Sequence, residues 1–185
     1  MSKILVDTID TRSGTSTLTL GSSNAGTIAL GSGDVQSNFL YPAFMATTSG
    51  ATNVNEATNI KVTYNTEVLD TNSNYDNSSN YRFTPTVAGK YFCFHSISVQ
   101  KVGGVSNTNY LFADIYFNGS MLYRSYADLS NNDGYALNGT INAIIDFNGS
   151  SDYIEAYMQL NTANGDQATI LGANYSMFGA YRIGT

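Results

Sequence analysis

Short runs in which apolar and polar side chains alternate, separated by polar turns, occupy the chain from about residue 39 to its end. This period of two predicts β-strands, and no long stretch repeats with the period of a helix. Many short strands with turn signals between them predict an all-β sandwich or barrel. The predicted strands are Tyr41–Thr47, Ile60–Leu69, Asn80–Thr86, Gly89–Lys101, Asn109–Phe117, Ser120–Ala127, Tyr135–Phe147, Asp152–Leu160, Gln167–Leu171 and Tyr175–Ile183.

Two Asn-Gly dipeptides give the strongest turn signals. Asn118-Gly119 separates two apolar runs and predicts a two-residue hairpin, since both residues tolerate the positive φ that such a turn requires. Asn148-Gly149 predicts a second hairpin with a slightly longer loop. A further predicted turn spans Asn72–Ser79, where asparagine and serine replace apolar residues.

The strand predicted at Gly89–Lys101 has two apolar faces. Alternation puts Tyr91, Cys93 and His95 on one face, and Phe92 and Phe94 on the other. A strand that is apolar on both sides is expected between the core and a contact with another subunit. The alternation alone leaves open which face is which.

Residues 1–38 have a different character, because they contain no aromatic residue whereas the rest of the chain holds 14 tyrosines and 9 phenylalanines. A repeat occurs here, with Thr17–Ser22 followed by the similar Thr27–Ser32. Each unit is a short alternating strand ended by glycine, and so narrow an apolar strip buries little within one chain. The pattern predicts a β-rich stalk or docking arm at 1–38 and a head at 39–185, with a flexible linker as the alternative.

Composition narrows the range of functions. Only 12% of the 185 residues are charged, and the net charge is −6 with eight lysines and arginines. Nucleic acid is bound mainly by cations that neutralise phosphate, so no nucleic-acid partner is expected. Neither a basic amphipathic stretch nor an apolar span predicts membrane insertion. One cysteine allows no intrachain disulfide, and no secretory signal follows Met1, so synthesis in a cytoplasm is expected.

Three groups of landmarks occur in order along residues 39–185. They are the segment Tyr81–Phe92, the hairpin Phe117-Asn118-Gly119 and the closing segment Tyr175–Tyr181. Tyr64, Asp70 and Tyr75 precede them at matching spacing. This pattern resembles the globular head of the C1q and tumour-necrosis-factor (TNF) superfamily. Cys93 and His95 depart from it, because the family usually has aromatic residues there.

The resemblance implies a ten-stranded jelly-roll sandwich that assembles as a homotrimer around a three-fold axis. Tyrosine and phenylalanine are abundant enough for both a core and a subunit contact. Six aromatic residues are expected in the core or the trimer contact: Tyr91, Phe92, Phe94, Phe117, Phe178 and Tyr181.

Two groups of residues are candidates for chemistry. Cys93 and His95 could form a nucleophile–base pair, but side chains two apart on a strand lie about 6–7 Å from each other, which is long for the hydrogen bond required. We therefore expect both to fill the interior and the chain not to be an enzyme. Calcium is the one candidate cofactor, because oxygen ligands gather in the acidic turns; otherwise none is expected. Its candidate ligands are Asp128, Asn131, Asn132, Asp133, Asp152 and Glu155.

The threonine-rich N-terminal segment resembles those of bacteriophage tail fibres and other virion structural proteins, on which C1q-like heads occur. We predict a bacteriophage structural protein of the virion, a trimeric tail fibre or a tail or capsid appendage. Residues 1–38 would contact other virion proteins, and the head would bind a host-surface glycan or outer-membrane component. One alternative is a decoration protein that cements the capsid or tail without binding a receptor. Another is a soluble C1q-like recognition protein.

Overall fold

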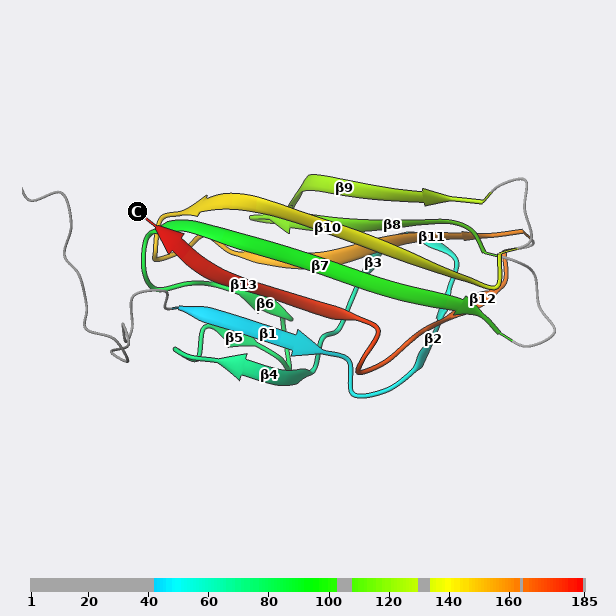
Figure 1. Cartoon of the computed structure of the whole chain (residues 1–185), viewed down its shortest axis with the longest axis horizontal. Helices are drawn as coiled ribbons and strands as arrows, with labels where there is room; N and C mark the ends of the chain where they lie inside the picture. The colour runs from blue at the N-terminus through cyan, green and yellow to red at the C-terminus, as the bar shows by residue number, and fades with distance from the viewer. Residues whose placement is uncertain (1–41, 103–107, 130–133, 164, 185) are drawn as a thin grey trace, which may run out of the picture. The chain divides into compact units, whose positions relative to one another are not determined.

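The structure is a computed structural model that describes residues 42–102, 108–129, 134–163 and 165–184. The predicted stalk at 1–38, and Asn131, Asn132 and Asp133, lie outside the described residues. The described residues form thirteen strands in two antiparallel sheets and contain no helix, hence none that could cross a membrane (Figure 1).

Sheet A consists of β1 (Ala43–Thr47), β2 (Thr52–Asn55), β4 (Thr66–Asp70), β7 (Gly89–Lys101), β10 (Ala136–Phe147), β12 (Gln167–Ile170) and β13 (Met177–Gly184). Sheet B consists of β3 (Ala57–Lys61), β5 (Tyr75–Asp76), β6 (Arg82–Phe83), β8 (Thr108–Phe117), β9 (Ser120–Asp128) and β11 (Ile154–Thr162).

Strand β7 organises sheet A. It pairs with β10 over nearly its whole length on one side. On the other side it pairs first with β13 and then, near its end, with β12. The chain passes from sheet A to sheet B after β7, returns to sheet A at β10, and crosses again at β11 and at β12. These repeated crossings build a two-layer jelly roll, and Figure 1 shows β7, β10 and β13 running side by side.

Stacked and edge-on aromatic rings fill the space between the sheets. The ring of Phe44 lies 4.3 Å from Phe83, 4.7 Å from Tyr75 and 5.1 Å from Phe178, centroid to centroid. Phe83 and Phe178 are fully buried, as is Tyr64. Burial of such large rings removes extensive apolar surface from water, and their stacked and edge-on contacts add to the stability of the core.

The sequence pattern predicted most strands, and Gly89–Lys101 has the predicted bounds. The single strand predicted over Ile60–Leu69 is wrong: β3 ends in sheet B and β4 begins in sheet A. Val62 and Tyr64 occupy the crossing and are buried, which keeps the apolar alternation unbroken across it. The predicted turn at Asn72–Ser79 contains the short strand β5, and β2 was not predicted. The predicted number of ten strands therefore becomes thirteen segments.

The two Asn-Gly dipeptides form different connections. Asn118 and Gly119 both have positive φ, at 50° and 80°, and join β8 to β9 in the predicted hairpin. The hairpin predicted at Asn148-Gly149 is wrong, because β10 and β11 belong to different sheets. Gly149 has a φ of 72°, and a Cβ added there would lie 2.3 Å from the backbone nitrogen of Ala88. This glycine therefore permits close approach of two loops rather than a tight turn within one sheet.

Replacing Gly149 by alanine should lower the free energy of unfolding by about 3 kcal/mol or more, because positive φ and a backbone collision act together. Gly165 provides the matched control: its φ is 74°, yet nothing lies within 4 Å of an added Cβ. Gly165→Ala should cost only the strain of the left-handed backbone, about 1–2 kcal/mol. Denaturant unfolding of both variants measures the difference. Equal losses in the free energy of unfolding would show that the close contact between Gly149 and Ala88 does not add to the effect of the substitution.

Candidate functional site

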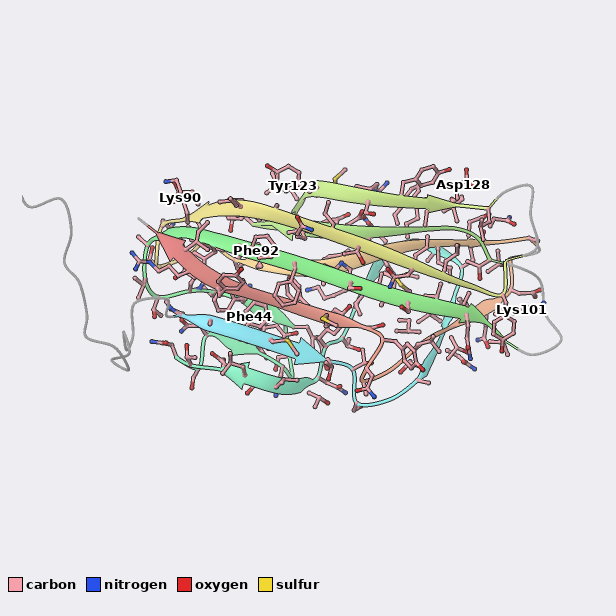
Figure 2. All side chains as sticks on the ribbon, in the orientation of Figure 1. Phe44, Lys90, Phe92, Lys101, Tyr123 and Asp128 are labelled. Atoms are coloured by element: carbon pink, nitrogen blue, oxygen red, sulfur yellow. The ribbon has the colours of Figure 1, made fainter. Side chains whose placement is uncertain are left out.

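An exposed apolar patch lies on the outer face of sheet A, where β1, β4, β7, β10 and β13 are neighbours. We call it the sheet A face and define it by the following residues: Met45, Leu69, Phe92, Phe94, Ile144 and Tyr181. Phe92 stands opposite Ile144 on one side and Tyr181 on the other. Ile144 is 58% exposed and Tyr181 41% exposed, so water covers much of this patch in the single chain. Figure 2 shows Phe92 projecting from β7.

Gly179 allows the Phe94 ring to lie close against sheet A. Gly179 on β13 stands opposite Phe94, and a Cβ at this position would lie 2.3 Å from the Phe94 ring. The ring of Phe94 therefore lies over the backbone of the neighbouring strand. The ring of Phe92 lies 5.4 Å from Tyr181 and 6.4 Å from Phe94, so the three aromatic side chains form one continuous surface.

Farther along β7 and β10 the same side of sheet A becomes polar. Asn138 donates to the hydroxyl of Ser98 at 2.8 Å, and its oxygen accepts from Thr140 at 2.9 Å. The hydroxyls of Ser96 and Thr140 are 3.1 Å apart. A partner docked across the whole side would meet apolar rings at one end and a hydrogen-bonded polar ladder at the other.

A second exposed apolar surface lies at the start of β9. Met121, Leu122 and Tyr123 are 48%, 40% and 44% exposed, and we call these three residues the β9 edge. Among the described strands β9 pairs only with β8, so it borders sheet B, and Figure 2 shows Tyr123 on this strand. Met121 stands opposite Tyr116 on the outer side of sheet B, and Tyr123 stands opposite the buried Ile115. Apolar side chains at the free side of an edge strand invite association with another surface.

The six aromatic residues singled out from the sequence divide between interior and surface. Tyr91 and Phe178 are fully buried in the core. Phe117 is partly buried against the core, with its ring 5.7 Å from Phe147. The other three lie on the sheet A face. The alternation along β7 did not say which of its two faces lies in the core. In the structure Tyr91 points inward, and Phe92 and Phe94 point outward.

Cys93 and His95 are both fully buried. Burial raises the pKa of the Cys93 thiol, whose Sγ lies 3.7 Å from the backbone oxygen of Tyr91. The Nδ1 of His95 lies 3.1 Å from the backbone oxygen of Asp114, while Nε2 has no partner among the described residues. Burial lowers the pKa of His95 to about 4. A thiol held protonated, with no exposed path to a substrate, is not arranged for nucleophilic catalysis.

The candidate calcium ligands within the described residues are engaged separately. Asp152 accepts from the side chain of Asn118 and the backbone of Asn148. Glu155 pairs with Lys61 at 2.6 Å, and Asp128 accepts from the Tyr126 hydroxyl. Among the described residues, His, Cys, Asp and Glu form no group of three or more that could hold a metal ion.

Two features of the surface were not predicted from the sequence. The β9 edge is contiguous in sequence, but its apolar residues look like an ordinary strand until β9 is known to be an edge. The second feature is the ion pair of Asp114 with Arg124, in which the carboxylate is fully buried and accepts at 2.7 and 2.8 Å. The hairpin predicted at Asn118-Gly119 places Asp114 and Arg124 on neighbouring strands. Opposite charges on paired strands could therefore have predicted this ion pair.

Comparisons with known proteins give the class of fold. No protein-family model matches the chain, and no curated protein matches its sequence. Solved structures do match: Eiger TNF from S. frugiperda has a TM-score of 0.56 at 10% identity, covering 76% of this chain and 91% of that one. Murine APRIL gives 0.55 at 11%, covering 76% and 98%, and the globular domain of zebrafish complement 1qA gives 0.51 at 15%, covering 77% and 97%.

These structural neighbours show that the chain has the fold of the C1q and TNF jelly-roll heads. The resemblance drawn from the aromatic landmarks is confirmed for the fold. The two antiparallel sheets agree with this class, whereas the trimer, the stalk and a bacteriophage source are not part of what the shared fold shows.

His95 makes stability depend on pH. Its folded pKa of about 4 lies below the ordinary value of 6.5, so the folded state binds fewer protons than the unfolded chain between these values. Stability should be complete above pH 6.5 and fall by about 3 kcal/mol as pH drops to 4. His95→Phe should remove this part of the loss, measured by urea unfolding across the pH range. Parallel curves for both proteins would contradict the assignment, since His95 is the only histidine.

Proposed function

We propose that residues 39–185 form a non-enzymatic binding head that assembles as a homotrimer. The observation that carries this proposal is that one chain exposes two different apolar surfaces, the sheet A face and the β9 edge. Burying aromatic and aliphatic side chains removes apolar surface from water and stabilises association. Each chain thus carries both halves of a contact.

A contact between two unlike surfaces is head-to-tail, and copies joined in this way close into a ring when the rotation between neighbours divides a full turn. The β9 edge of one copy would pack on the sheet A face of the next. The resemblance to the C1q and TNF heads, whose fold this chain shares, implies a homotrimer, and this supports three copies around one axis. The polar ladder of Ser96, Asn138 and Thr140 would lie toward one end of the contact and provide hydrogen bonds for its register.

The full-length protein should have the mass of three 19.9 kDa chains in light scattering. Phe92→Asp and Tyr181→Asp should each reduce it to one chain at micromolar concentration, because a carboxylate would be stripped of water in the contact. Tyr126→Asp, on the outer side of sheet B, is the control and should leave the trimer intact. A wild-type monomer would overturn the trimer, and dissociation by the control as well would place the contact elsewhere.

We also propose the biological setting predicted from the sequence, a bacteriophage virion protein that is a tail fibre or a tail or capsid appendage. Residues 1–38 would contact other virion proteins, and the head would bind a host-surface glycan or outer-membrane component. The repeat of Thr17–Ser22 at Thr27–Ser32 and the weakly charged composition support this setting. The same features support the alternative function, a decoration protein that cements the particle without binding a receptor. The fold is equally compatible with a soluble C1q-like recognition protein.

The virion proposal predicts that gold-labelled antibodies against the head mark one kind of structure on intact particles in electron micrographs. Particles lacking the gene should lose that label. If they also keep infectivity but disassemble more readily, cementing is the function. Recovery of the protein only from unassembled lysate would contradict any place in the virion.

A further inference from the structure

The outer side of sheet B, which is the side opposite the core, carries a surface made mainly of aromatic rings. Alternation along β8 points Tyr110, Phe112, Asp114 and Tyr116 outward, while Leu111, Ala113 and Ile115 are fully buried. Neighbouring strands add further side chains to this side. We call the assembly the sheet B platform, with the members Lys61, Tyr110, Phe112, Asp114, Tyr116, Arg124, Tyr126, Tyr157 and Gln159.

The first aromatic cluster of the platform lies where β8 meets β9. The rings of Tyr110 and Phe112 are stacked with centroids 4.9 Å apart and planes inclined by 16°. Tyr126, across the strand pair, meets Phe112 edge-on at 4.7 Å and is 58% exposed. Gln159 donates to the Tyr110 hydroxyl at 3.1 Å. A ring is therefore presented to solvent beside an amide and two hydroxyls that are held in place.

The second cluster lies where β8 meets β11. The rings of Tyr116 and Tyr157 are stacked with centroids 4.1 Å apart. The Tyr116 hydroxyl donates to Asn59 at 2.6 Å, and the ammonium of Lys61 lies 5.5 Å from the Tyr157 ring centroid. Phe112 and Tyr116 are four residues apart on β8, so the two clusters are about 13 Å apart along the strand. A ligand that touches both clusters must be extended.

The charges of the platform compensate one another locally. Arg124 and Asp114 form a two-hydrogen-bond pair between the clusters, and Arg124 also lies 4.4 Å from the Phe112 ring centroid. Lys61 pairs with Glu155, which is only 6% exposed. Both of these acids are buried and each is paired with its base. Asp128, an exposed residue on the same side of β9, accepts from the Tyr126 hydroxyl. The platform thus offers oriented donors, and both Lys61 and Arg124 already have a carboxylate partner. Charge complementarity therefore selects an uncharged polar partner.

We infer that the sheet B platform binds an uncharged oligosaccharide. A sugar ring offers C–H groups on its faces, which pack on aromatic rings, and hydroxyls on its rim, which pair with the amide, guanidinium and phenol groups present here. Met121, which is 48% exposed and stands opposite Tyr116, adds an apolar side chain beside the second cluster. The first cluster is bordered by the amide of Gln159 and the carboxylate of Asp128. A linear chain of sugars has the extended shape required to reach both clusters.

This inference deepens the proposed function and rests on it in one respect, the number of copies. The trimer would use the outer side of sheet A and the start of β9, whereas the platform lies on the outer side of sheet B. Met121 of the β9 edge stands opposite Tyr116, so the contact would lie beside the second cluster and leave the first cluster, with Tyr126, open to solvent. Three platforms in one particle would convert weak single contacts into avid attachment to a surface with repeated sugars. Each single site is complete within one chain.

The test uses the full-length protein and an array that carries short neutral oligosaccharides beside sialylated and sulfated ones. Binding should concentrate on neutral glycans. Tyr126→Ala and Tyr157→Ala should each weaken binding to the best of them by about tenfold or more, because each removes a ring from one cluster. Tyr126→Phe retains the ring and should keep binding within a few-fold. Tyr135→Ala is the matched control: it removes an equally exposed tyrosine, 62% against 58%, outside the platform, and should change nothing.

Two further measurements keep the outcomes distinct. Light scattering reports whether each variant is still a trimer, and saturation-transfer NMR with the free oligosaccharides detects single-site binding even in a monomer. A silent array and silent NMR with an intact trimer would overturn the glycan site alone. A monomer that still binds through Tyr126 would overturn the trimer alone. Preference for charged glycans, binding unaffected by both alanine variants, or capture of a protein partner by the platform would each refute the inference.

Discussion

The alternation of β7 between core and surface is the constraint on which the rest of the head depends. Its odd-numbered side chains enter the aromatic core beside Phe178, while Phe92 and Phe94 point outward. β7 also holds β10, β12 and β13 in register, so a slip by one residue would exchange core and surface throughout sheet A. Gly179 adds to this constraint, since only glycine leaves room for the ring that lies across β13. The same packing that stabilises the fold thereby creates an apolar outer face.

The two sheets turn different kinds of surface to solvent. Sheet A presents a continuous surface of aromatic and aliphatic groups, which gains most from contact with another apolar surface. Sheet B presents rings that already contact one another and are interleaved with hydrogen-bonded polar groups and compensated charges. The cost of burying the Asp114 carboxylate is offset by the two hydrogen bonds that Arg124 donates to it. One side is suited to self-association and the other to a polar ligand, and both follow from residues on β7 and β8.

Much of the fold could be predicted because local signals and tertiary structure agree. The hairpin at Asn118-Gly119 and the strand Gly89–Lys101 needed only turn chemistry and alternation. The Ile60–Leu69 prediction failed because a chain crossing between sheets kept the same alternation through Val62 and Tyr64, both pointing into one core. For the candidate sites, Cys93 and His95 are fully buried. The rings that cover His95 come from distant parts of the chain, Tyr64 from the β3–β4 connection and Phe178 from β13.

The sequence by itself determined the all-β class, the aromatic-rich head and the two faces of β7, because alternation, turn residues and composition act over a few neighbours. Only the tertiary structure decided which of those faces is the core, that β9 is an edge, and that Phe112, Arg124 and Tyr126 meet Tyr116 and Tyr157 on one surface. The physical reason is the pairing of strands far apart in the chain: β11 lies beside β8, and β10 and β13 lie beside β7. Side chains separated by dozens of residues become neighbours through hydrogen bonds that no local pattern specifies.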